Sequence, residues 1–163
     1  MNKQFVTAGR AIFTLEMPPA FTGPRDLPPH YTFQVTRKEA TDAWPESYFV
    51  ALLTGPDNES DYTYLGKLDP TTGVVKLTKA SKYRGDSWPF LLAKHVFWAL
   101  WTGDEGAAKI KGAGFDLHHE GRCGRCGRTL TTPLSVTTGF GPHCRKVLGL
   151  DVGGETEDNS ELD

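Results

Sequence analysis

The spacing of three cysteines constrains this chain more than any other feature. Cys123 and Cys126 are separated by two residues, Cys144 follows after 17 intervening residues, and the chain has no other cysteine. An odd number of thiols in a chain whose first residues show no apolar signal-peptide run argues against a disulfide framework and favours the cytoplasm. Two thiolates on one tight turn can bind a tetrahedral Zn²⁺ without strain. The sequence therefore predicts a zinc site.

The fourth ligand of this zinc site has several candidates. Structural zinc sites usually have four protein ligands, and Cys3His is a common set. His119, on the segment that leads into Cys123, is the favoured candidate, followed by His143 and then by His118, which an extended strand would direct to the opposite face. Water in the fourth position would leave the site open. Thiolates favour Zn²⁺ over iron, because an iron–sulfur cluster normally needs four of them.

The rest of the chain predicts an α+β fold. Patterns typical of strands cover residues 11–17, 31–37, 48–53, 62–68 and 74–78. The apolar segment 88–101 predicts one buried helix, with Ser87 as N-cap and Gly103 at its end. We expect an antiparallel sheet of about five strands packed on this helix and followed by a small treble-clef-like or ribbon-like zinc unit.

Composition suggests four segments along the chain. Residues 1–102 form the β-rich domain with its helix, and residues 103–117 form a glycine-rich linker. Residues 118–150 form the zinc-binding unit, in which residues 128–140 have the composition of a hairpin. This unit has so few apolar residues that its folding should require the metal. Residues 151–163 carry six acids and no base, which predicts a disordered tail.

The segment 119–144, HEGRCGRCGRTLTTPLSVTTGFGPHC, resembles a cysteine motif of unknown function that is common in phage and actinobacterial proteins. The resemblance is strongest here and extends weakly over residues 5–149, with departures at Leu134 and His143. The matching positions are Cys123, Cys126, Gly127, Arg128, Leu130, Thr131, Pro133, Ser135, Gly139, Gly141, Pro142 and Cys144. The resemblance implies a zinc knuckle, supports His119 as a ligand and suggests a phage or mobile-element origin. It supplies no activity.

The formal net charge of −2 conceals two basic groups of side chains. One lies in the zinc unit and comprises Arg122, Arg125, Arg128, Arg145 and Lys146; the other comprises Lys76, Lys79, Lys82 and Arg84. Cations beside tyrosines such as Tyr62, Tyr64 and Tyr83 suit single-stranded or structured nucleic acid, because phosphates meet cations and bases stack on rings. We therefore favour a non-catalytic, zinc-binding accessory protein of phage type that contacts nucleic acid.

Two other function classes compete with this interpretation. A protein-interaction module would bind and inhibit a host factor, such as a defence complex. A metal-finger nuclease would use His118 or His119 beside the metal, but the chain has no further motif that completes such a site, nor a nucleotide-binding or hydrolase fingerprint. No apolar run is long enough to span a bilayer, so a membrane is not among the expected partners.

Overall fold

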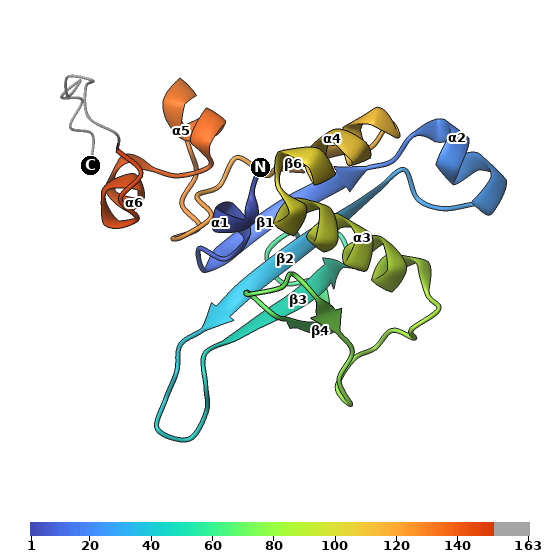
Figure 1. The fold of residues 1–163 in the computed structure, drawn as a ribbon, viewed down its shortest axis with the longest axis horizontal. Coiled ribbons are helices and arrows are strands. Elements are labelled where there is room, and N and C mark those ends of the chain that lie inside the picture. The colour runs from blue at the N-terminus through green and yellow to red at the C-terminus, as the bar shows by residue number, and fades with distance from the viewer. Residues whose placement is uncertain (152–163) are drawn as a thin grey trace.

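The computed structural model describes residues 1–151 and shows an α+β fold built on one six-stranded antiparallel sheet (Figure 1). The strand order is β5-β4-β3-β2-β1-β6. The expected fold class is thus confirmed, with one strand more than expected. Residues 152–163, which hold most of the predicted acidic tail, lie outside the described part of the chain.

Five of the strands follow the sequence patterns closely. They are β1 (Arg10–Glu16), β2 (His30–Lys38), β3 (Ser47–Leu53), β4 (Tyr62–Leu68) and a short β5 (Val75–Lys76). The sixth, β6 (Asp116–His119), pairs with β1 and places His119 opposite Phe13. Short elements occupy both ends of β1: α1 (Lys3–Val6) precedes it, and α2 (Pro19–Thr22) and the 3₁₀ helix η1 (Gly23–Arg25) follow it.

The main core lies between the sheet and helix α3 (Trp88–Thr102), which crosses one face of the sheet (Figure 1). Phe97 of α3 is fully buried, and its ring centroid lies 5.8 Å from that of Phe13 and 6.4 Å from that of Phe33. Side chains alternate along β1 so that its odd-numbered residues are buried and its even-numbered residues face away. The opposite face carries the half-buried side chains of Ile12 and Thr14.

The segment 103–117, which we expected to be a linker, contains helix α4 (Asp104–Gly112) and strand β6. Acidic side chains in the first turn of α4 and lysines in its last turn complement the helix dipole, and Glu105 forms an ion pair with Lys109 at 3.3 Å. Gly106 allows α4 to approach α3, because a Cβ at this position would collide with the carbonyl oxygen of Ala99. One of the glycines that suggested a linker, Gly106, therefore serves a helix contact.

The hairpin expected over residues 128–140 is also absent from the described structure. Residues 133–138 form helix α5 (Pro133–Thr138), followed by α6 (Pro142–Val147). The hydroxyl of Thr132 accepts a hydrogen bond from the backbone N–H of Ser135, and Pro133 occupies the first helical position. Both are helix-start signals, and they outweigh the turn propensity of this proline.

Candidate metal centre

Three cysteines converge at the centre of residues 118–150, which we call the metal unit. The sulfur atoms of Cys123, Cys126 and Cys144 all lie within 4.8 Å of one another. Cys123 and Cys126 lie on one tight turn, closed by the N–H of Gly127, which donates to the carbonyl of Cys123 at 2.9 Å. Cys144 is the third residue of α6. Gly127 has a φ of 77°, which explains why glycine follows the second thiol.

The polar groups around Cys123 favour its thiolate. Burial acts to raise the pKa of this thiol, but the backbone N–H groups of Cys126, Gly141 and Arg125 point at the sulfur and lower its pKa to about 7. At Cys144, burial and the two neighbouring sulfurs raise the pKa, and the guanidinium of Arg125, whose Nη1 lies 3.7 Å from Sγ, opposes them only in part. The chain alone therefore does not stabilise three thiolates together, whereas a bound cation would.

The three sulfurs fit a soft divalent metal. A tetrahedral Zn²⁺ with Zn–S bonds of about 2.3 Å places its sulfur ligands about 3.8 Å apart. The sulfurs of the three cysteines, all within 4.8 Å of one another, could reach this separation with small movements. All three cysteines are free thiols, and two of them are buried. The described residues thus contain a group that can hold a metal ion, and thiolate chemistry favours Zn²⁺ for it.

The structure does not bring His119 to the three sulfurs. Its Nε2 lies 2.5 Å from the carbonyl oxygen of Val136, and its Nδ1 accepts a hydrogen bond from the N–H of Gly121 at 3.0 Å. Its ring packs on Phe5, with centroids 5.8 Å apart. Because a ring nitrogen must offer a lone pair to bind a metal, this arrangement leaves neither nitrogen available.

The other two candidate histidines are also outside the thiol group. His118 lies on β6 opposite Thr14, and its Nε2 is 3.2 Å from a carboxylate oxygen of Glu16. His143 is the exposed second residue of α6. Among the described residues, the chain therefore brings three of the four expected ligands together.

Three of the arginines predicted as contact residues have internal partners. Arg122 forms an ion pair with Glu59 at 3.0 Å, and Arg125 donates to the sulfur of Cys144. Arg145 donates to the hydroxyl of Ser135 and to the carbonyl of Phe140, both at 3.2 Å. Arg125 and Arg145 thus link parts of the metal unit, and Arg122 links it to the loop before β4, which their sequence pattern did not reveal.

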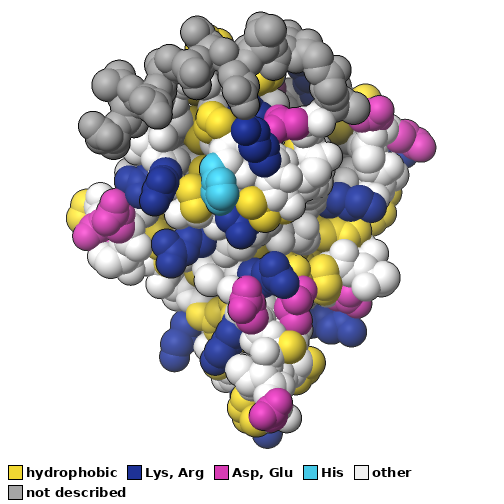
Figure 2. Space-filling view, turned by 90° about the vertical axis from the view of Figure 1, so that its left-hand side faces the viewer, with side chains coloured by type: hydrophobic (Ala, Val, Ile, Leu, Met, Phe, Trp, Pro, Cys, Tyr) yellow, Lys and Arg dark blue, Asp and Glu magenta, His cyan; other side chains and the backbone are white. Residues whose placement is uncertain are grey.

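The remaining cations of the metal unit, Arg128 and Lys146, are exposed. A further basic side chain, Arg10 of β1, lies near Arg128: a Cβ built on the adjacent Gly127 would be 3.6 Å from its Cδ. Nothing in the local sequence marks Arg10, because only the folded chain brings it to residue 127. Figure 2 shows Lys and Arg side chains around a histidine on the side of the molecule that carries the metal unit.

The second predicted basic group lies elsewhere. Lys76 is on β5, and Lys79, Lys82 and Arg84 follow it, all exposed, with Arg84 paired to Asp86 at 3.2 Å. Strand β5 is at one edge of the sheet, and β6, which leads into the metal unit, is at the other (Figure 1). The two basic groups therefore do not form one continuous surface along the sheet.

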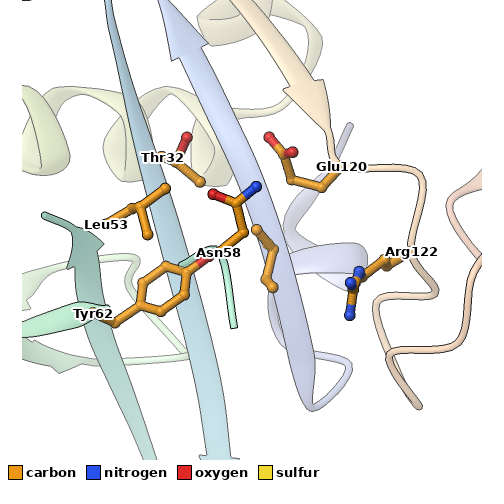
Figure 3. Close-up of a pocket in the computed structure, with 7 residues that line it drawn as sticks. Thr32, Leu53, Asn58, Tyr62, Glu120 and Arg122 are labelled. Carbon is orange, nitrogen blue, oxygen red and sulfur yellow. The ribbon is translucent and has the colours of Figure 1, made fainter. Parts of the chain in front are cut away.

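A polar cavity between the sheet and the start of the metal unit was not expected from the sequence (Figure 3). It has a volume of about 180 Å³ and is lined by Ile12, Thr32, Leu53, Asn58, Tyr62, Glu120 and Arg122. The hydroxyl of Tyr62 is buried and has no hydrogen-bond partner in the described structure. The carboxylate of Glu120 accepts a hydrogen bond from Thr14. These residues come from four separate segments, so no local motif could have revealed them.

Comparison with known proteins defines the metal unit as a recognised segment. Residues 118–149 match the model of a family of unknown function, DUF6011. The match begins at β6 and ends just after α6, so it covers all three cysteines. No curated protein and no solved structure matches the chain. Within residues 1–151, no helix is long and apolar enough to cross a membrane.

Proposed function

We propose that this protein is a non-catalytic, zinc-binding protein that contacts single-stranded or structured nucleic acid through the metal unit. The observation that supports zinc binding is the convergence of three reduced cysteines within 4.8 Å. Zinc in this position would have a structural role. Few side chains of the metal unit are buried apart from the cysteines, the main ones being Leu130, Ser135 and Phe140. Such a small core favours folding that depends on the metal.

The charge of the metal unit supports a nucleic-acid ligand. Residues 118–150 contain five basic and one acidic side chain. Arg128, Lys146 and Arg10 are exposed, and the side chain of Arg10 approaches Gly127, next to Arg128. Cations that contact phosphates release condensed counterions, which gives binding that weakens steeply with salt.

The positions of the histidines favour a binding role over the nuclease alternative. A metal-finger nuclease needs a histidine general base close to its metal. His118 instead faces Glu16, and both ring nitrogens of His119 have partners in the chain. Among the described residues, no histidine joins the thiol group.

Binding of a host protein is the second candidate, and an apolar hollow between α3 and residues 72–75 favours it. Its volume is about 390 Å³, and its lining includes Val74, Leu91 and Trp98. These three side chains are 44%, 38% and 47% exposed, although large apolar side chains are usually buried. Under this second candidate, binding of the host protein could inhibit a host defence complex.

Two measurements on the full-length chain test the proposal. Elemental analysis should find about one zinc per chain, as expected for a single tetrahedral site. Fluorescence anisotropy with labelled single-stranded DNA and RNA should show binding that weakens as salt rises. A Cys126→Ser variant should lose zinc and bind nucleic acid less tightly.

Specific outcomes would contradict the proposal. Protein with no metal after purification from zinc-supplemented cells would remove its first half. Zinc-loaded protein that binds no nucleic acid at low salt, but retains a host protein after nuclease treatment of the lysate, would favour the second candidate instead.

A further inference from the structure

The residue at position 141 stands where a fourth cysteine would complete the site. The segment Gly141-Pro142-His143-Cys144 has the same spacing as Cys123-Gly124-Arg125-Cys126, with glycine in the place of the first thiol. Gly141 is the N-cap of α6, so it lies one helical turn before Cys144. Paired ligands three residues apart at a helix start are a geometry that closes tetrahedral zinc sites.

Contacts of Gly141 place it beside the three sulfurs. Its backbone N–H donates a hydrogen bond to the sulfur of Cys123. A Cβ built on Gly141 meets no atom within 4 Å, so a side chain at this position would have room. The φ and ψ of −68° and 162° are accessible to every amino acid, and backbone conformation does not require glycine here. Among residues 1–151, three sulfur ligands converge, and position 141, whose N–H contacts one of them, has room for a further side chain.

We propose that the metal keeps an exchangeable fourth coordination position on the side of Gly141, and that a small thiol from solution binds there. This inference rests on the proposed binding of metal by the three cysteines. A fourth soft donor matches the other three, since thiolates prefer the same metals. A divalent metal with three thiolates has a single net negative charge. The guanidinium of Arg125, 3.7 Å from the sulfur of Cys144, offsets this charge and makes a further thiolate acceptable.

The test uses Co²⁺ in place of Zn²⁺ in the full-length chain, because the charge-transfer absorption of Co²⁺ reports the number of bound thiolates. Adding 2-mercaptoethanol to the wild-type protein should increase this absorption by about one third, as expected for four thiolates in place of three. Gly141→Cys should show the higher absorption without added thiol and should not respond to it. Gly112→Cys, whose Cβ position is also open, whose φ is not positive and which lies outside the thiol group, is the matched control and should behave as the wild type.

Histidine variants separate an open site from a closed one. His119→Ala and His143→Ala should respond to the thiol as the wild type does, and so should a chain that ends at Asp151. If the wild type ignores the thiol and one of these variants gains the response, the removed group is the fourth ligand and the inference is wrong.

Two further results have distinct meanings. If neither added thiol nor Gly141→Cys increases the absorption, the inference is wrong, although three-thiolate metal binding stands. If the wild type binds no Co²⁺ or Zn²⁺ at all, the proposed function itself fails. Circular dichroism checks that Gly141→Cys is folded; if it is not, the thiol titration of the wild type decides the question alone.

Discussion

The ring of Phe5 lies directly against Gly124, so that a Cβ at Gly124 would be 2.6 Å from Cδ2 of Phe5. A Cβ at Gly139 would meet the same atom at 2.7 Å, and the ring of Phe140 is 5.8 Å from that of Phe5 between centroids. A side chain from the first helix of the chain thus fills the centre of the metal unit. The metal unit and the sheet consequently share one core, although they are distant in sequence.

Replacing Phe5 should weaken both the fold and the metal site. Phe5→Ala removes a side chain that is only 3% exposed, and such a change costs about 3–5 kcal/mol of unfolding free energy. Because the lost ring supports the turn that carries Cys123 and Cys126, the affinity for zinc should fall as well. Urea denaturation and competition with a zinc-binding dye measure the two effects.

Phe21→Ala is the control for this experiment. The ring of Phe21 packs on Trp88 and Phe115 at the other end of the sheet, away from the thiols. This variant should lower stability without changing zinc affinity. If Phe5→Ala destabilises the chain but binds zinc as tightly as the wild type, the metal unit does not depend on α1.

Two glycines of α4 should respond to alanine in opposite directions. Gly106→Ala places a methyl group against the carbonyl oxygen of Ala99, so α4 must move away from α3 and the unfolding free energy should fall. At Gly112, a Cβ meets nothing within 4 Å, and alanine should be neutral or stabilise the helix by up to about 1 kcal/mol. Thermal denaturation of both variants measures the difference. Equal effects of the two changes would contradict the close contact between α3 and α4.

The behaviour of α4 shows where sequence patterns succeed and where they fail in this chain. The long strands and α3 have strong apolar periodicity, so their local pattern agrees with their burial. Helix α4 has five residues other than glycine that favour helices, but its glycines predict a break in the helix. Only the folded structure shows that Gly106 lies against Ala99 of α3. A tertiary contact decided the role of Gly106, and no local signal carries that information.

The metal site also has one part that the sequence predicts, the convergence of the cysteines, and one part that it does not, the position of His119. The spacing of the cysteines predicted their convergence, because a tight turn and a helix start bring thiols together by local geometry. The position of His119 depends instead on β6, a four-residue strand whose register on β1 directs the ring toward Phe5 and Val136. Strand pairing of this kind joins residues about a hundred positions apart in sequence, and short strands of this type carry little pattern of their own.

Zinc binding should release a number of protons that depends on pH. In the metal-free protein the pKa of Cys123 is lowered to about 7, so this thiol is ionised at high pH and protonated at low pH. Zinc binds the thiolate, so binding above about pH 8 should release about one proton fewer than binding below about pH 6. Isothermal calorimetry in buffers of different ionisation enthalpy measures this number. A proton release that is the same at both pH values in the wild type would contradict the lowered pKa.

Removing cations beside the cysteine turn should reduce the salt dependence of nucleic-acid binding. Arg10→Gln and Arg128→Gln each remove an exposed charge near Gly127, and each lost phosphate contact should reduce the slope of log K against log salt by about 0.7 for a single strand. Lys111→Gln removes an exposed charge of α4 and serves as the control, with an unchanged slope. Anisotropy titrations at several salt concentrations provide these slopes. If Lys79→Gln and Lys82→Gln reduce the slope and the arginine variants do not, the contact surface lies at the β5 edge of the sheet rather than on the metal unit.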